Sequence, residues 1–230
     1  HKFGQRLGIY SRRVRRRLAG RRPCWIHAVS VGEVNVALRL IQGWRTRAGA
    51  PRGFVLSTTT STGFALAERD APGDCEVIYY PLDFAPVVAA AVAAVRPRML
   101  VLVEAEVSPN MVSAMRRRRV PVALVNARLS PRSKRRFLRF RRLLAPLFRM
   151  LDAVCVQDAG DAGVWRRLGL PGARIHHCGG IKYDGTAAAA ERGDSGAARE
   201  LLRRLGVADD APLLLGGSTH PGEERLLAEA

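Results

Sequence analysis

Short runs of apolar residues alternate along the chain with longer segments in which apolar residues recur every three or four positions. The short runs are typical of β-strands, and the wider spacing is typical of amphipathic helices. Most of the short runs lack an alternating polar position, which indicates strands that are buried on both faces of a sheet. Strands are predicted at residues 24–28, 53–57, 75–79, 98–103, 121–125, 153–157 and 174–178.

Helical segments separate these strands from one another. Several of the loops before them contain Ser, Thr or Asp, which cap helix N-termini. A regular alternation of strand and helix is the pattern of an α/β protein with a parallel, doubly wound, Rossmann-like sheet. Helices are predicted at residues 33–45, 62–69, 84–95, 109–118, 133–149 and 161–168.

Residues 1–22 follow a different pattern. Apolar residues fall on one helical stripe and arginines surround it, so we predict a basic amphipathic helix over this segment. Two interpretations stay open: the helix binds an anionic membrane surface, or it packs on the domain with its basic face in solvent. The stripe consists of Phe3, Leu7, Tyr10, Val14 and Leu18.

Composition divides the rest of the chain into three parts. Residues 23–184 hold the predicted strands of a first domain, and the Gly- and Ala-rich residues 185–196 are typical of a linker. Residues 197–230 begin a second α/β unit with a single predicted strand. Because one strand cannot form a sheet, we expect this unit to be the truncated start of a second Rossmann-like domain, and the 230-residue chain to be inactive alone.

Basic residues are in large excess and are unevenly distributed. The sequence has 38 Lys and Arg against 20 Asp and Glu, which gives a net charge of +18. Residues 1–22 and 107–151 contain no acidic residue. Such blocks favour binding to polyanions, whether nucleic-acid phosphate, lipid phosphate or an anionic membrane surface. The charge alone does not choose among these partners.

Composition also excludes two classes of protein. With 47% hydrophobic residues the chain is not disordered, and no stretch approaches the roughly 20 apolar residues that span a bilayer. The four cysteines lie far apart and include no C-x-x-C pair. We therefore expect buried thiols in a cytosolic protein, with no metal site and no cofactor.

Polar residues stand directly after three of the predicted strands, which is where ligands bind in open α/β sheets. Glu33 follows the first strand, and Glu104 and Glu106 follow the fourth with a spacing that points both side chains to one side of a strand. Asn126 and Arg128 follow the fifth strand. Each has a structural alternative, because a glutamate also suits a helix N-terminus and the other residues could cap loops.

Two glycine-containing segments are candidate anion receptors. Residues 179–184 place Lys182 near the domain boundary. Residues 216–224 combine a glycine turn with the start of a helix, whose free N–H groups suit phosphate. Neither segment matches a Walker P-loop or a dinucleotide-binding G-x-G-x-x-G, so neither identifies a nucleotide by itself.

In this order, the segments resemble the Kdo transferase family, which transfers 3-deoxy-D-manno-octulosonic acid (Kdo) from CMP-Kdo to lipid A precursors. The resemblance extends over nearly the whole chain from Pro23. It is carried by residues 25–33 (WIHAVSVGE), 58–63 (TTTSTG), 80–83 (YPLD), 104–106 (EAE), 126–130 (NARLS), 179–184 (GGIKYD) and 217–220 (GSTH), with Glu223 and Glu224.

The resemblance implies a GT-B glycosyltransferase, in which a first Rossmann-like domain holds the acceptor and a second holds the CMP-sugar. It also implies that Glu33 is the general base of a metal-independent, inverting transfer. The acceptor-binding residues implied by the matching segments are Ser30, Gly32, Thr60, Gly63, Glu104, Glu106, Asn126 and Arg128. The donor-binding residues implied in the same way are Lys182, Ser218, Thr219, His220 and Glu223.

The partners implied by the resemblance are CMP-Kdo as donor, a lipid A precursor as acceptor and an anionic membrane surface, with no nucleic acid. The expected location is the cytoplasmic face of the bacterial inner membrane, where the two arginine blocks would face lipid phosphates. The chain departs from the family pattern at Ala105, Val107 and Ser108, where relatives usually carry Thr, Leu and Trp, and at Gly180, where they carry Asn. These departures affect the acceptor and donor contacts.

Two other functions fit part of the sequence. Another GT-B envelope glycosyltransferase, with a UDP-sugar as donor, would share the architecture. A basic nucleic-acid-binding α/β protein would explain the net charge of +18, although no RNA-binding motif is present and the aromatic content of 6% limits base stacking.

Overall fold

The computed structural model describes residues 2–47, 49, 51, 53–104, 107–181, 200, 202–208, 211 and 225. The chain divides into two compact units, His1–Lys182 and Tyr183–Ala230. In the second unit, Glu200 and residues 202–204 are helical. The predicted linker at residues 185–196 and the single predicted strand of the second unit lie outside the described residues.

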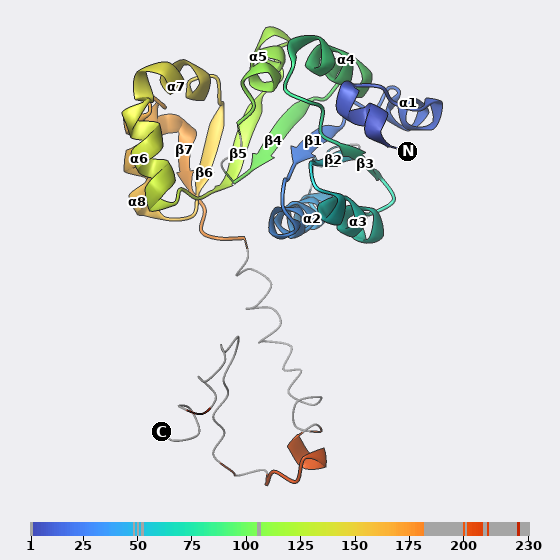
Figure 1. The fold of residues 1–230 in the computed structure, drawn as a ribbon, viewed down its shortest axis with the longest axis vertical. Helices are drawn as coiled ribbons and strands as arrows, with labels where there is room; N and C mark the ends of the chain where they lie inside the picture. The colour runs from blue at the N-terminus through green and yellow to red at the C-terminus, as the bar shows by residue number, and fades with distance from the viewer. Residues whose placement is uncertain are drawn as a thin grey trace. The chain divides into compact units, whose positions relative to one another are not determined.

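A parallel sheet forms the centre of the first unit. In the described residues it has seven strands, in the order β3-β2-β1-β4-β5-β6-β7 (Figure 1). All the strands predicted for the first domain are confirmed, and so is the Rossmann-like α/β class. The strands are β1 (Cys24–His27), β2 (Phe54–Thr58), β3 (Cys75–Tyr79), β4 (Met99–Val103), β5 (Val122–Ala127), β6 (Ala153–Val156) and β7 (Ile175–His177).

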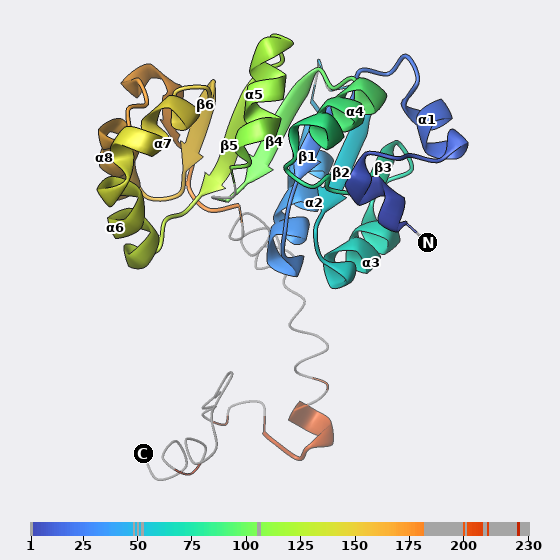
Figure 2. The same cartoon turned by 45° about the horizontal axis from the view of Figure 1, so that its top comes forward.

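Helices cover both faces of this sheet. Two of them, α2 and α3, lie on one face, and α4 and α5 lie on the other (Figure 1, Figure 2). Alternate strand residues point to opposite faces, so Trp25 joins the core that contains α4 and α5, whereas Ile26 joins the core that contains α2 and α3. The helices are α2 (Val31–Arg45), α3 (Ser61–Asp70), α4 (Ala85–Val95), α5 (Pro109–Arg117), α6 (Pro131–Arg139), α7 (Arg141–Phe148) and α8 (Ala159–Arg167).

The prediction of a single helix over residues 133–149 is wrong. The chain turns at Phe140 and forms α6 and α7 instead. The turn brings the ring of Phe137 to 5.5 Å from the ring of Phe148, which lies 5.3 Å from the ring of Trp165 in α8. In one straight helix, two residues this far apart in sequence would be separated by about 16 Å along the axis. The turn therefore lets both phenylalanines pack in the cluster around the buried tryptophan.

The prediction of a single N-terminal helix over residues 1–22 is also wrong. The segment forms a 3₁₀ helix, η1 (Phe3–Leu7), and a separate helix, α1 (Arg12–Leu18). Gly8 lies between them in a left-handed conformation, with a φ of 76°. It packs so closely on α4 that a Cβ at this position would lie 2.8 Å from the carbonyl oxygen of Val87. Contact with α4 therefore interrupts the helix that the apolar stripe predicts.

The two halves of the apolar stripe have different environments. Tyr10, Val14 and Leu18 are buried in the core on the α4 face of the sheet. Phe3 and Leu7 are exposed, at 67% and 41%. For α1, the structure supports packing on the domain, whereas η1 leaves apolar side chains in solvent.

Candidate active site

The predicted site residues lie along the edge of the sheet at which the strands end. From β1 the chain proceeds to β2 and β3, and then returns to β4 on the other side of β1. Loops that leave a sheet on either side of such a reversal leave a crevice between them, and ligands bind there in open α/β sheets. Glu33 follows β1 and Glu104 follows β4, so these two residues flank the reversal.

The structure brings the described acceptor residues to this one edge. The strands that carry them are neighbours, in the order β2, β1, β4 and β5. Apart from Glu33 and Glu104, they are Thr60 and Gly63 after β2, Ser30 and Gly32 after β1, and Asn126 and Arg128 at the end of β5.

Glu33 lies in the first turn of α2, where backbone N–H groups hold its carboxylate. Oε2 accepts a hydrogen bond from the Val29 N–H at 2.9 Å, and Oε1 accepts one from the Ser30 N–H at 3.3 Å. The Ser30 hydroxyl accepts from the Glu33 N–H at 3.2 Å, which completes a capping box. Glu33 therefore has the structural role that was the alternative to catalysis, as a residue that caps the N-terminus of α2. A carboxylate has about four acceptor positions, so capacity is left to accept a proton from a bound hydroxyl.

Two threonine side chains connect the loop after β2 to the loop after β1. The hydroxyls of Thr58 and Thr60 each donate to the Val29 carbonyl oxygen at 3.0 Å. The Thr60 hydroxyl also accepts from the Gly63 N–H at 3.1 Å and so caps α3. A Cβ at Gly63 would lie 2.7 and 2.8 Å from the two hydroxyl oxygens. The structure thus gives Gly63 a packing role, and its contact with an acceptor stays a prediction.

Glu104 and Asn126 both adopt left-handed backbone conformations, with φ values of 65° and 55°. Such strain is uncommon outside glycine and concentrates at functional sites. Asn126 is 2% exposed, and its side-chain amide has no hydrogen-bond partner in the described part of the chain. An unsatisfied buried polar group costs about 1–3 kcal/mol. The amide is one of several buried polar groups without a partner in the described residues, and at this edge it is free to bind a ligand.

A buried histidine lies beneath the same edge, at the end of β1. His27 Nδ1 lies 3.0 Å from the Ser57 carbonyl oxygen, and its ring stacks on Tyr80 with 3.5 Å between the ring centroids. Burial lowers the pKa of His27 to about 4, while the hydrogen bond to the Ser57 backbone opposes this shift. The imidazole is therefore neutral at pH 7, which fits a packed side chain rather than a proton carrier.

Asp83 has a positioning role that the sequence did not assign. Its carboxylate accepts from the Asn110 N–H at 3.2 Å and from the Met111 N–H at 3.0 Å. It caps α5 in this way, whereas Ser108 at the N-cap position makes no side-chain cap. Asp83 thereby fixes the helix that follows the Glu104 loop. It belongs to the matching segment at residues 80–83, but no local pattern shows which distant helix it reaches.

Residues 1–185 match the family model of 3-deoxy-D-manno-octulosonic-acid transferase (Kdo transferase). The chain belongs to this family. It is similar to the Kdo transferase of Haemophilus influenzae, at 28% identity over 242 residues that cover 97% of this chain and 54% of the relative. It is 33% identical to that of Bordetella pertussis over 218 residues, which cover 90% of this chain and 47% of the relative. The chain thus spans about half the length of these curated relatives.

Two further likenesses are more distant. A bifunctional glycosyltransferase/methyltransferase of Fusobacterium nucleatum is 25% identical over 207 residues, which cover 89% of this chain and 31% of that protein. The fold is similar to that of the UDP-GlcNAc 2-epimerase from Neisseria meningitidis bound to UDP-GlcNAc, with a TM-score of 0.56 over 82% of this chain and 56% of that chain. At 8% identity this likeness shows the fold alone, and it agrees with the GT-B-like class predicted from the sequence.

The remaining predicted site residues lie outside the described residues. The residue before Lys182 is Ile181, whose carbonyl accepts from the Arg39 side chain of α2 at 3.3 Å. At Ile181 the chain therefore lies beside α2, the helix that holds Glu33 in its first turn. The residues outside the described part are Glu106 of the acceptor set and Lys182, Ser218, Thr219, His220 and Glu223 of the donor set.

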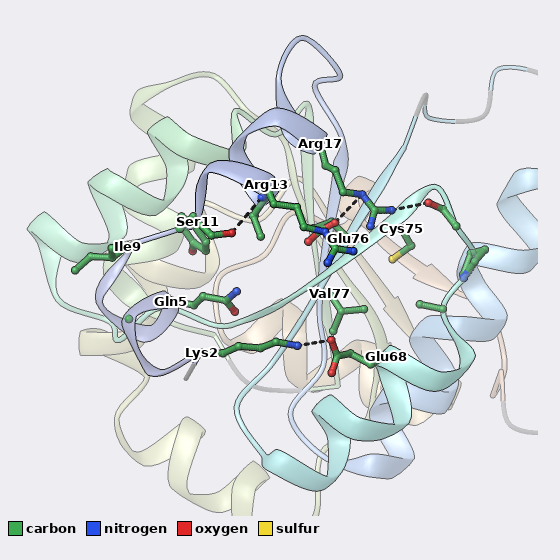
Figure 3. Close-up of a pocket in the computed structure, with 16 residues that line it drawn as sticks. Lys2, Gln5, Ile9, Ser11, Arg13, Arg17, Glu68, Cys75, Glu76 and Val77 are labelled. Atoms are coloured by element: carbon green, nitrogen blue, oxygen red, sulfur yellow. Dashed lines mark hydrogen bonds and ion pairs between the residues drawn. The ribbon is translucent and has the colours of Figure 1, made fainter.

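A pocket of about 590 Å³ lies away from this edge, between the N-terminal segment, the end of α3 and the edge strand β3 (Figure 3). Arg17 contacts Glu76 there at 3.0 Å, and Lys2 pairs with Glu68, so most of its charges are neutralised. None of the predicted site residues lines it. The pocket therefore belongs to the packing of the N-terminal segment against the sheet.

Two kinds of feature are absent from the residues that the structure describes. No three His, Cys, Asp or Glu side chains there come close enough together to hold a metal ion. None of the described helices combines the length and the apolar character that a membrane crossing requires.

Proposed function

We propose that the chain is the acceptor-side portion of an enzyme that transfers Kdo from CMP-Kdo to a lipid A precursor. Membership of the Kdo transferase family supports Kdo transfer, and the donor nucleotide, the acceptor and the mechanism are the proposal. The observation that carries it is the Glu33 carboxylate, held by two backbone N–H groups at the reversal of strand order. The strained Glu104 and the unsatisfied Asn126 follow the adjacent strands β4 and β5.

In the proposed reaction, Glu33 is the general base of an inverting, metal-independent transfer. Its carboxylate takes the proton of the acceptor hydroxyl while the hydroxyl oxygen forms a bond to the anomeric carbon of Kdo. The bond from that carbon to the phosphate oxygen of CMP breaks, and CMP leaves with the electron pair. Attack from the face opposite to CMP inverts the anomeric configuration. Base catalysis of this kind contributes roughly 10²–10⁴-fold to the rate.

The loops after β2, β1, β4 and β5 bind the acceptor in this proposal. Arg128 is exposed and pairs with no described residue, so its guanidinium suits a phosphate group of the lipid A precursor. The Asn126 amide offers a donor and an acceptor to a sugar hydroxyl. The other acceptor contacts are assigned to Ser30, Gly32, Thr60, Gly63, Glu104 and Glu106. Contacts with CMP-Kdo are assigned to Lys182, Ser218, Thr219, His220 and Glu223.

We place the reaction at the cytoplasmic face of the bacterial inner membrane, because a lipid acceptor requires the enzyme to reach a bilayer surface. The arginine blocks at residues 1–22 and 107–151 suit anionic headgroups. The N-terminal segment and the loop before α4, which are joined by a hydrogen bond from the Leu82 N–H to the Arg6 carbonyl at 2.8 Å, expose apolar side chains that suit the membrane interface. These side chains are Phe3, Leu7, Ile9, Leu82 and Phe84.

Transfer by the full-length protein, assayed with labelled sugar donors and a lipid A precursor that lacks Kdo, tests this proposal. We expect Kdo to be transferred from CMP-Kdo and no sugar to be transferred from UDP-GlcNAc. Transfer from UDP-GlcNAc without transfer from CMP-Kdo would make the protein a UDP-sugar glycosyltransferase. Analysis of the product anomer checks the inverting step, and addition of EDTA checks metal independence.

A further inference from the structure

Arg6 joins η1 to two loops at the edge of the candidate site. Its Nη2 donates to the Thr59 carbonyl oxygen at 2.5 Å, and its Cζ lies 4.6 Å from the centroid of the Tyr79 ring. The carbonyl oxygen of Arg6 accepts from the Leu82 N–H at 2.8 Å. One residue outside the sheet therefore holds both the loop after β2 and the loop after β3.

The rest of η1 is fixed to the sheet on which these loops stand. Gln5 is 8% exposed, and its Oε1 accepts from the Tyr79 N–H at 2.9 Å at the outer edge of β3. Lys2 pairs with Glu68 of α3, and its Nζ lies 4.4 Å from the centroid of the Phe64 ring (Figure 3). These contacts place Arg6 with respect to β3 and α3 independently of its own side chain.

The loop that is held in this way also supports the predicted base. Thr59 lies between Thr58 and Thr60, whose hydroxyls both donate to the Val29 carbonyl oxygen. The N–H of Val29 in turn donates to Glu33 Oε2 at 2.9 Å. Val29 thus accepts hydrogen bonds from the loop through its carbonyl oxygen and donates one to the Glu33 carboxylate through its N–H.

We propose that Arg6 is a positioning residue for the general base, because it holds the 58–60 loop that supports Val29 and, through Val29, Glu33. This inference rests on the proposed function, in which Glu33 is the base. A charged donor makes a stronger hydrogen bond than a neutral one, and the cation also contacts the Tyr79 ring. Arg6→Ala therefore removes the support, whereas Arg6→Lys keeps a charge and a donor and restores part of it.

Amide hydrogen exchange in the 230-residue chain tests the structural step without any substrate. In Arg6→Ala we expect exchange at Val29 and Ser30, whose N–H groups donate to Glu33, to accelerate about tenfold, with the amides of β4 and β5 unchanged. Arg12→Ala is the matched control, because Arg12 is an exposed arginine at the start of α1 with no contact to these loops. Unchanged exchange at Val29 overturns the proposal, and so does equal acceleration throughout the sheet.

Transfer kinetics of the full-length protein test the catalytic step. We expect Arg6→Ala to lower kcat about tenfold with little change in KM for CMP-Kdo, and Arg6→Lys to recover part of the loss. Accelerated exchange at Val29 with an unchanged kcat overturns the positioning role. Glu33→Gln separates this proposal from the one it rests on. If that variant transfers Kdo at the wild-type rate, the base assignment fails by itself, while the exchange result still decides whether Arg6 holds the loop.

Discussion

Glu33 has a structural role and, in the proposed reaction, a catalytic one, and both use the same two oxygen atoms. The carboxylate caps the turn after β1, and the two N–H groups that it binds orient it toward the edge where the strands end. A glutamine at this position can keep the capping-box hydrogen bond through its one side-chain oxygen, but it cannot accept at both positions and it cannot take a proton. The structural and chemical roles of the side chain can therefore be separated by one substitution.

Gly63 offers a test of how tightly the 58–60 loop is packed. We predict that Gly63→Ala destabilises the protein by about 1–3 kcal/mol, because its Cβ would lie 2.7 Å from the nearer threonine hydroxyl oxygen. Gly43→Ala in α2 is the control: its Cβ would meet no atom within 4 Å, so it should stabilise the protein by about 0.5–1 kcal/mol. Urea unfolding of both variants measures the difference. Equal unfolding free energies of the two variants would mean that the 58–60 loop moves to make room for the Cβ at residue 63 without a cost in stability.

His27 predicts how stability depends on pH. Its folded-state pKa of about 4 lies below the ordinary 6.5, so the unfolded chain binds the proton first as the pH falls. The contribution of His27 is fully present above pH 6.5 and is lost as the pH falls toward 4, by about 2 kcal/mol between pH 7 and pH 5. Urea unfolding at these two pH values should show a steeper loss for the wild type than for His27→Gln. Parallel losses would place the pKa of His27 near its ordinary value.

At the scale of elements, the sequence predicts the sheet better than the helices. Strands in a parallel sheet are buried on both faces, so each appears as a continuous apolar run whatever it packs against. Helix ends depend on contacts that are distant in sequence. Gly8 contacts α4, and Phe137 contacts Phe148 because the chain turns at Phe140. The local spacing of apolar residues predicts neither contact. The contacts of Asp83 and Arg6 are also distant in sequence, so no local pattern predicted a role for either residue.

Helix α1 provides a test of the membrane proposal. Arg15 and Arg16 are exposed on it, whereas Arg17 pairs with Glu76 of β3. A basic residue near an anionic surface contributes about 1 kcal/mol, within a Debye length of about 8 Å at physiological salt. We therefore predict that replacing Arg15 and Arg16 with Gln weakens binding to anionic vesicles by about 2 kcal/mol and leaves neutral vesicles unaffected.

Vesicle co-sedimentation measures this effect, and Arg69→Gln is its control. Arg69 is an exposed arginine of α3 that pairs with Asp70 on the opposite face of the sheet from α1, so the Arg69→Gln variant should bind anionic vesicles as the wild type does. Equal losses on neutral and anionic vesicles would assign the effect to packing, and no loss would leave the basic face of α1 as a solvated surface.

At the scale of the whole molecule, the order of the strands determines which loops lie next to one another at the candidate site. The reversal between β1 and β4 is a property of topology, so the sequence could predict which strand ends carry polar residues but not which of those ends are neighbours. The structure adds this adjacency for β2, β1, β4 and β5. It also adds the left-handed backbone of Glu104, which no propensity of glutamate predicts, and that of Asn126, a residue type that adopts this conformation more readily. Membership of the Kdo transferase family is the basis for the proposed Kdo transfer.

The rate of Kdo transfer by full-length Glu33→Gln tests the central claim most directly, with CMP-Kdo and the lipid A precursor both at saturating concentrations. We expect a loss of roughly 10²-fold or more, with CMP-Kdo affinity close to that of the wild type. The unfolding free energy should fall by no more than about 1.5 kcal/mol, because glutamine can keep the capping-box hydrogen bond and loses one acceptor together with the base. A transfer rate within about threefold of the wild type would contradict the central claim, since general base catalysis contributes far more than that.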